Sequence, residues 1–272
     1  MRRPSRGRSV GLVAFLFGMT GREILPGLVL RRLLEDLGLS PDASRALLSR
    51  MRRHGQLSSR RRGREVDYRL HGEFAAGFRR VRDQSMADAP PWPGHFHVVL
   101  YQVPERERAF RDALRRTAVL TGYGVLQPGV LIAPTDRRAA LNDLLRNPPA
   151  RAQVWDTTLA MDTDDAARAA SLAWDLPGLA QTYYAHIDRL TRVIEAHRAV
   201  VAGHDPTDAS EAVRIYVDTL LPALTDTLRE PGLPPELMPL DWPGAHLRAS
   251  ITRFTQTFSG TTGPYLDRLL AR

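Results

Sequence analysis

The segment spanning residues 40–70 constrains the fold more than any other part of the chain. Ser40 is a favourable N-cap residue, and Pro41 suits a first helical turn, where an amide hydrogen is not needed. Gly55 is a natural residue just past the end of a helix. Together these signals predict a helix over residues 41–54.

Two short strands are expected after this helix, over residues 57–61 and 65–70, around a turn at Arg62-Gly63. A helix followed by a basic hairpin is the pattern of a winged helix-turn-helix, in which the helix enters the major groove and the wing contacts phosphate. Helical periodicity assigns two opposite faces. One carries Ala43, Leu47 and His54, and the other carries Arg45, Leu48, Ser49 and Arg52.

Arginine and small polar side chains on the second face are candidate DNA contacts. We expect Arg45, Ser49 and Arg52 to reach base edges, because an arginine can bind guanine through two hydrogen bonds. The hairpin arginines, with Arg2, Arg3, Arg6 and Arg8 of an N-terminal arm, are expected to contact phosphate or the minor groove. The full candidate set is Ser44, Arg45, Leu48, Ser49, Arg52, Arg53, Arg60, Arg61, Arg62 and Arg64.

The charge distribution favours a polyanion as partner for the same part of the chain. The formal charge of the chain is +8. Residues 1–82 hold 19 arginines and 7 acidic residues, a net charge of +12, whereas the rest holds 19 and 23, a net charge of −4. Lysine is absent, so phosphate contacts would come from arginine, helix N-termini or neutral donors. An arginine run is also common in solvated turns, so its position beside a capped helix matters.

Composition excludes several classes of protein. With no cysteine, the chain has no disulfides, thiolate metal sites or cysteine nucleophiles. No apolar run reaches the length that spans a bilayer, and the basic start leads into a short apolar segment without a clear cleavage site. We therefore expect a cytoplasmic, nucleoid-associated protein without a membrane partner.

The expected fold class is α+β with several domains. A proline-rich break at 87–94 separates an N-terminal domain, residues 1–83, from a middle domain, residues 92–161. The middle segment reads strand–helix–strand–strand–helix–strand, the order of a ferredoxin-like domain. An all-α C-terminal domain is expected over residues 162–272, ending in a helix to about Phe258 and a short one from Pro264.

With these features in place, the chain resembles the PaaX family of bacterial transcription repressors. The resemblance covers nearly the whole chain and depends on the order and spacing of its motifs. They are LFGMTGRE (16–23), SRALLSRMRRHG (44–55), RRGREVDYRL (61–70), WPGHFHVVLYQVPERERAFRDALRR (92–116), GYGVLQPGVLIAP (122–134), AWDL (173–176) and LPPELMPLDWPG (233–244).

The resemblance implies a DNA-binding repressor. It implies a winged-helix domain, a ferredoxin-like middle domain that dimerises and relays signals, and a helical C-terminal domain. The protein would bind a double-stranded DNA operator as a homodimer and leave it when a small-molecule effector binds, such as an acyl- or aryl-CoA thioester. No cofactor is implied. This chain departs from the family at Gln56, usually bulky and apolar, at Gln102, often aspartate, and in residues 216–230, which bears on the effector.

Aromatic and arginine side chains are the candidate effector contacts, since ligand pockets combine apolar surface with a few charged groups. Most such aromatic residues in any protein are plain core. The candidate set is Trp92, Arg115, Arg116, Tyr123, Trp174, Tyr183 and Tyr184, with Trp155, Trp242 and Arg189 as further possibilities.

Enzymatic alternatives have little support. The chain has no P-loop and no GxSxG motif. His95 and His97 share one face of a predicted strand but have no evident third ligand, so we expect neither a metal site nor catalytic residues. Gln102 stands where a related nuclease-like domain would place a metal-binding aspartate, and an amide is a poor ligand for a hard divalent cation. The alternatives left open are a nucleic-acid-processing enzyme anchored by the winged helix, and an adaptor whose winged helix binds protein.

Overall fold

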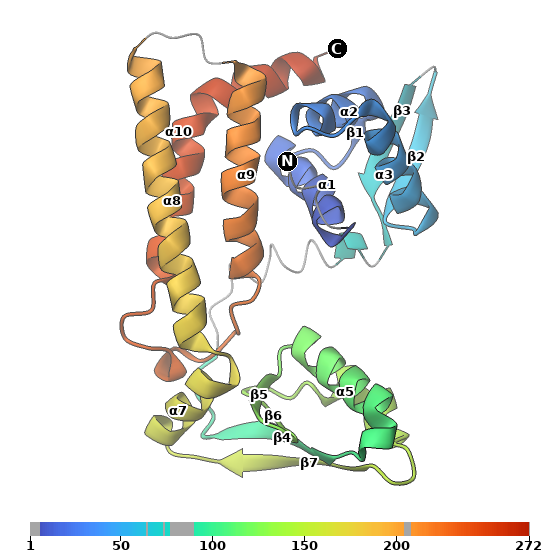
Figure 1. Ribbon diagram of the computed structural model, residues 1–272, viewed down its shortest axis with the longest axis vertical. Helices are drawn as coiled ribbons and strands as arrows, with labels where there is room; N and C mark the ends of the chain where they lie inside the picture. The colour runs from blue at the N-terminus through green and yellow to red at the C-terminus, as the bar shows by residue number, and fades with distance from the viewer. Residues whose placement is uncertain (1–5, 64, 73, 77–89, 204–207, 272) are drawn as a thin grey trace. The chain divides into compact units, whose positions relative to one another are not determined.

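The computed structural model describes residues 6–63, 65–72, 74–76, 90–203 and 208–271 (Figure 1). Most of residues 71–83, and residues 87–89 of the proline-rich break, lie outside these ranges. The chain forms two compact units. One comprises residues 1–87, 185–227 and 246–272, and the other residues 88–184 and 228–245. The three-domain division therefore stays a prediction.

The N-terminal part of the first unit contains helices and strands, of which the third helix and the hairpin after it lie where the sequence predicts them. The helices are α1 (Arg6–Thr20), α2 (Gly27–Asp36) and α3 (Pro41–Arg53). The strands are β1 (Leu25–Pro26), β2 (Leu57–Arg62) and β3 (Glu65–Leu70), in an antiparallel sheet of order β1-β3-β2. Strand β1 was not expected, because two residues are too short to show a periodicity. Arg6 and Arg8 belong to α1 and not to an arm.

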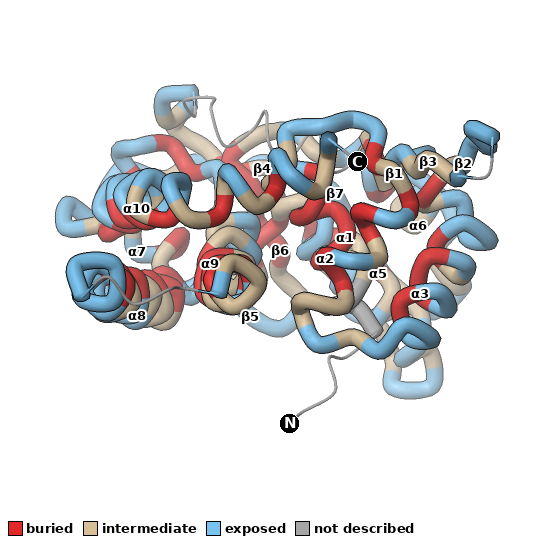
Figure 2. The backbone as a smooth tube through the Cα atoms, turned by 90° about the horizontal axis from the view of Figure 1, so that it is seen from above, coloured by how far each residue is buried: buried red, intermediate tan, exposed pale blue. Residues whose placement is uncertain are grey.

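Three long helices lie in the C-terminal part of the chain. They are α8 (Leu176–Ala202), α9 (Ala209–Thr227) and α10 (Gly244–Leu270). Buried residues recur every three or four positions along α8, and Figure 2 shows them on one side of that helix. The predicted break before Pro264 is wrong, since α10 continues through this proline. Proline removes one helical hydrogen bond, but the helix continues on both sides of it.

Aromatic packing joins the beginning and the end of the chain within the first unit. Phe15 of α1 lies 6.3 Å from Tyr216 of α9, measured between ring centroids, and Tyr216 stacks on Phe254 of α10 at 5.5 Å. The Tyr265 hydroxyl of α10 donates a hydrogen bond to the Asp36 carboxylate at the end of α2. Helices α1 and α2 therefore pack with α9 and α10.

The second unit is built on a four-stranded antiparallel sheet of order β5-β6-β4-β7. The strands are β4 (His95–Gln102), β5 (Gly124–Gln127), β6 (Val130–Ala133) and β7 (Gln153–Ala160), and their order among the helices is the predicted one. The helices are α5 (Arg108–Leu120), α6 (Asn142–Arg146) and α7 (Thr163–Ala173), with 3-10 turns η1 (Glu105–Glu107), η2 (Arg138–Leu141) and η3 (Pro235–Leu237).

The two faces of this sheet carry separate cores. Val99, Leu131 and Tyr123 pack with residues of α5 and η2 on one face. Phe96 and Val98 pack under α7 and η3 on the other. Gly124 allows the second core to close, because a Cβ atom there would lie 2.7 Å from the indole ring of Trp174.

Candidate nucleic-acid interface

Helix α3 begins and ends as its sequence predicts. The Ser40 side chain accepts a hydrogen bond of 3.2 Å from the backbone amide of Ala43, and Pro41 occupies the first turn. At the other end, Gly55 has φ of +68°, a conformation that glycine adopts without strain. Both ends of the helix are thus fixed by local interactions, and its position in the chain is confirmed.

The buried face of α3 differs from the predicted one. Ser44 and Met51 are 0% exposed, and Leu47 and Leu48 are 2% exposed, whereas Ala43 and His54 are exposed. Ser44 and Leu48 were candidate DNA contacts, and we correct this assignment because their side chains face the core. The predicted apolar face is rotated around the helix axis from the observed one, because the prediction did not count Met51.

The outer face of α3 keeps the other candidates. Arg45, Ser49, Arg52 and Arg53 are all exposed. Arg45 forms an ion pair with Asp42 one turn earlier on the same helix. Arg52 and Arg53 form no ion pair with another described residue, and they lie in the last turn, where positive charge interacts favourably with the helix dipole.

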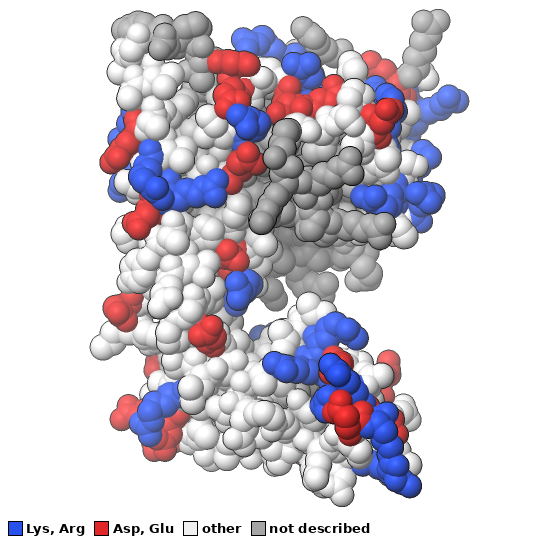
Figure 3. All heavy atoms as spheres, viewed as in Figure 1, with Lys and Arg blue, Asp and Glu red and all other residues white. Residues whose placement is uncertain are grey.

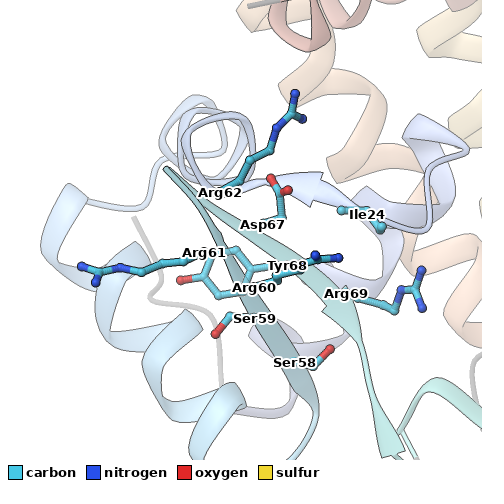
Figure 4. A pocket seen from close by; sticks show the side chains of 9 residues that line it. All are labelled: Ile24, Ser58, Ser59, Arg60, Arg61, Arg62, Asp67, Tyr68 and Arg69. Atoms are coloured by element: carbon cyan, nitrogen blue, oxygen red, sulfur yellow. The ribbon is translucent and has the colours of Figure 1, made fainter. Parts of the chain in front are cut away.

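The hairpin after α3 has two chemically different faces. Its register pairs Arg60 with Asp67, Arg61 with Val66 and Arg62 with Glu65. Because side chains alternate along a strand, Arg60 and Arg62 point to one side and Arg61 to the other, as Figure 4 shows. Figure 4 also shows Arg69 on the side of Arg60. Arg64, the remaining hairpin candidate, lies outside the described residues.

Both strands of the hairpin line an open hollow of about 540 Å³ (Figure 4). Its lining residues are Ile24, Ser58, Ser59, Arg60, Arg61, Arg62, Asp67, Tyr68 and Arg69. Arg69 approaches Glu23 at 3.7 Å, whereas Arg60, Arg61 and Arg62 make no ion pair with another described residue. The hairpin therefore presents three arginines that form no direct ion pair with a described carboxylate, an arrangement that can bind phosphate groups.

The candidate effector residues do not form one lining. Trp92 packs on Phe96 with ring centroids 4.6 Å apart, and Trp174 lies 6.4 Å from the same ring, so these two share a core. Tyr123 belongs to the core on the opposite face of the sheet. Arg115 and Arg116 are exposed on α5. This helix covers one face of the sheet, and both tryptophans pack on the opposite face.

Two of the candidate tyrosines are corrected to core residues. Tyr123 is 1% exposed and Tyr183 is 0% exposed, so neither side chain can reach a ligand in this structure. Burial raises the pKa of Tyr123. The Tyr183 hydroxyl donates a hydrogen bond of 3.0 Å to Glu230, which also accepts one from the Trp242 indole. Tyr184 is exposed, and its hydroxyl lies 3.4 Å from the Asp241 carbonyl oxygen.

Histidine and acidic side chains do not converge on a metal site in the described parts of the chain. His95 and His97 lie edge to face, with ring centroids 5.3 Å apart. Among the described residues, no group of three histidine or acidic side chains is placed to hold a metal ion. Within the same ranges, no helix is both long and apolar enough to cross a membrane.

Comparison with known proteins gives matches along most of the chain. Residues 18–74 match the family described as PaaX-like protein, residues 89–169 the PaaX protein central Cas2-like domain, and residues 174–268 the PaaX-like protein C-terminal domain. The chain is 25% identical to the transcriptional repressor PaaX of Escherichia coli (strain K12) over 246 residues, which cover 86% of this chain and 75% of that protein.

A solved structure has the same fold. It is the uncharacterized protein Rv0674 from Mycobacterium tuberculosis, with a TM-score of 0.60 and 24% sequence identity. The likeness covers 94% of this chain and 97% of the other.

Proposed function

The chain belongs to the PaaX family, and on that premise we propose that it is a transcriptional repressor that binds double-stranded DNA. The observation that carries the proposal is the exposed outer face of α3 beside the basic hairpin. Arg52, Arg53 and the three hairpin arginines (60–62) have no ion pair with another described residue. Unpaired arginines on a capped helix and a neighbouring hairpin fit the groove and backbone of a duplex.

We propose that residues 1–83 form a winged helix-turn-helix, with α3 as recognition helix and β2–β3 as wing. The order α1, α2, α3 and hairpin, and the packing of α3 against α1, α2 and β2, support this assignment. Arg45, Ser49 and Arg52 would contact base edges, and the wing arginines would contact phosphate. We propose that Arg53, next to Arg52 in the last turn, contacts the phosphate backbone of the DNA.

The middle segment, residues 92–161, is proposed to be a ferredoxin-like domain. Its strand order, numbered from the first strand of the segment, is 2-3-1-4 with all neighbours antiparallel, which supports the assignment. The family matches also change near residues 89 and 174, in support of the three-domain division. We propose a cytoplasmic homodimer without catalytic activity, released from its operator by a small-molecule effector. Trp92, Trp174 and Tyr184 remain candidates for effector contact.

The proposal is tested by selecting DNA fragments from a genomic library with the purified full chain. We expect a recurrent sequence with two related half-sites, since a symmetric dimer recognises a symmetric operator. Binding to the selected fragment should weaken steeply with added salt. The absence of any enriched sequence, or binding that a tenfold excess of random duplex removes, contradicts the proposal.

The enzyme alternative is tested on the same protein. The selected fragment, single-stranded DNA and RNA are incubated with the chain and magnesium or manganese, with chelator as control. The repressor proposal expects intact nucleic acid under all conditions. Metal-dependent cleavage that copurifies with the chain favours the processing enzyme.

A further inference from the structure

Helices α8, α9 and α10 of the first unit enclose a groove of about 700 Å³. The three helices lie side by side in both Figure 1 and Figure 2. Apolar side chains from all three line the groove, among them Val193, Val200, Ile215 and Phe258. Its volume falls in the range of sites that hold small organic molecules, roughly 300–1,000 Å³.

Two stacked rings form the bottom of this groove. The rings of His197 and Phe258 are 4.1 Å apart between centroids and inclined by only 19°. His197 Nε2 lies 3.2 Å from the Thr261 hydroxyl of α10, which fixes the orientation of the ring. Burial lowers the pKa of His197, so the imidazole is neutral at pH 7. The bottom of the groove is therefore aromatic and uncharged.

Arg189 and Arg192 of α8 bring positive charge to the groove. Both are exposed, and neither forms an ion pair with another described residue. Their hydrogen bonds go to backbone carbonyl groups, from Arg189 to Asp218 at 3.0 Å and from Arg192 to Asp188 at 3.4 Å. Each guanidinium keeps further N–H donors, and both can bind an anion.

The acidic residues of the groove already have partners. Asp208 accepts hydrogen bonds of 3.0 Å from the amide and the hydroxyl of Ser210, and Glu211 accepts one of 2.8 Å from Arg214. The groove therefore lacks an anion and has no need of a cation.

We propose that this groove binds a small organic molecule with one carboxylate and an apolar chain or ring, and that its binding weakens the operator complex. The inference rests on the proposed function, because it gives the effector proposed there a site and a chemical class. The carboxylate would contact Arg189 and Arg192, and the apolar part would cover the stacked rings. Among the effector candidates predicted from the sequence, only Arg189 lines the groove.

The groove is too sparsely charged for the coenzyme A thioester that the family resemblance implies. Such a thioester has no free carboxylate, and its nucleotide carries several phosphates for only two unpaired arginines. Arg192 and Val200 lie roughly two turns apart on α8, about 12 Å along the helix axis. This length suits a single extended chain or a ring with a short chain.

Packed side chains connect the bottom of the groove to the N-terminal helices. Phe258 lies 6.0 Å from Tyr216 between ring centroids, and Tyr216 lies 6.3 Å from Phe15 of α1. Farther along α10, Tyr265 donates its hydrogen bond to Asp36 of α2. Helix α3 packs against both α1 and α2. A ligand that shifts α10 can thus change the support of the DNA-binding helix.

The site is tested on the full chain with octanoate and 4-phenylbutyrate as probes in isothermal titration calorimetry. We expect octanoate to bind with a negative heat-capacity change, and octan-1-ol to bind about 10- to 100-fold more weakly because it lacks the charged hydrogen bonds. Octanoyl-coenzyme A should also bind more weakly than octanoate. Failure of both carboxylates to bind overturns the site, and tighter binding of the alcohol or the thioester overturns the chemical class.

Two pairs of matched variants locate the binding. Arg192→Ala should weaken octanoate by about 10- to 100-fold and leave octan-1-ol unchanged, whereas Arg198→Ala, exposed on α8 outside the groove, should change neither. Ala196→Trp should fill the groove and abolish octanoate binding, whereas Ala199→Trp, exposed outside the groove, should not. Equal effects within either pair overturn the location, and circular dichroism checks that each variant is folded.

The regulatory step is tested on the operator fragment selected by the chain. Saturating octanoate should lower operator affinity by roughly 5- to 150-fold, and linkage requires the operator to weaken octanoate binding by the same factor. Tyr265→Phe should bind octanoate normally and show a smaller fall in operator affinity. Unchanged operator affinity in the original protein contradicts the effector role, and a full effect in Tyr265→Phe contradicts the route through α10.

The fates of the two proposals are distinguishable. Sequence-specific DNA binding in a protein that binds neither carboxylate removes the site and leaves the repressor in place. Octanoate binding that is lost in Arg192→Ala, in a protein that selects no DNA sequence, supports the site and rejects the repressor.

Discussion

Two regions of this protein are rich in arginine, and they differ in which of these arginines form ion pairs. In the β2–β3 hairpin, Arg60, Arg61 and Arg62 make no ion pair with another described residue. Around α5 and η2, Arg111 contacts Glu105 at 2.8 Å, and Arg138 contacts both Asp136 and Asp156. Figure 3 shows arginine and acidic side chains interspersed over the α5 region. An arginine count alone therefore does not identify a surface for nucleic acid; the pairing of each charge does.

The largest expected effect comes from removing the unpaired charges. The variant with Arg60, Arg61 and Arg62 replaced by alanine should lower the salt dependence of DNA binding by about 3 in log–log slope, and affinity near 0.1 M salt by roughly several hundred-fold. Fluorescence anisotropy at several salt concentrations measures both. The matched variant replaces the paired Arg108, Arg111 and Arg138, and should bind like the original protein. Equal losses in the two variants would remove the distinction between the regions.

A smaller and more selective effect is expected on α3. Arg52→Ala should cost about 1–3 kcal/mol on the preferred operator and relax its sequence preference, because a bidentate arginine–guanine contact discriminates among bases. Competition binding against a panel of single-base operator variants measures the preference. Arg62→Ala serves as control, since loss of a phosphate contact should weaken all sequences alike. An unchanged preference in Arg52→Ala would reject its role in base readout.

Substitution of two helix-capping residues distinguishes an effect on stability from an effect on DNA binding. Ser40 caps α3, and Asp162 caps α7 by accepting a hydrogen bond of 2.8 Å from the Asp165 amide. Replacing either by alanine should reduce the free energy of unfolding by about 1 kcal/mol, as measured by urea denaturation. Only Ser40→Ala should also weaken DNA binding, because α3 belongs to the proposed interface. Equal weakening by Asp162→Ala would show that DNA binding depends on general stability.

The smallest expected effect is on the stability of the protein at low pH. The Arg138 guanidinium holds the pKa of Asp136 well below its usual range through hydrogen bonds, and Arg111 lowers the pKa of Glu105 in the same way. The stability from these pairs is therefore present above the ordinary carboxyl pKa and lost only as the pH falls through the lowered values. NMR titration should show Asp136 fully ionised at pH 5 and above, so these arginines stay paired. Titration of Asp136 at the usual value near 3.9 contradicts this.

Local signals in the sequence predicted most of the elements, and the reasons are visible in particular residues. Ser40, Pro41 and Gly55 define α3 because cap and stop residues act over one turn of helix. The alternation of residues 95–102 indicates strand β4, because successive side chains of a strand point to opposite faces of the sheet. Such features depend on neighbours in sequence, and sequence reasoning finds them.

Packing between residues far apart in the chain was harder to predict from the sequence. The orientation of α3 depends on what covers Met51 and Leu48, so Ser44 and Leu48 were assigned to the wrong face. Strand β1 forms because Leu25 and Pro26 meet Tyr68 and Asp67 of β3, and nothing in two residues signals such pairing. The aromatic candidates for effector binding were also dispersed, because aromatic residues serve both cores of the second unit equally well. Avoiding these errors would have required knowledge of which residues each side chain packs against.

The hydrogen bond between Tyr265 and Asp36 affects the order in which the protein folds during synthesis. A ribosome synthesises a chain from its N-terminus, so α2 leaves the exit tunnel long before α10 exists. The N-terminal helices and the hairpin therefore cannot acquire their full set of neighbours until α10 has been synthesised. A chain that stops before α10 would lack the hydrogen bond between Tyr265 and Asp36.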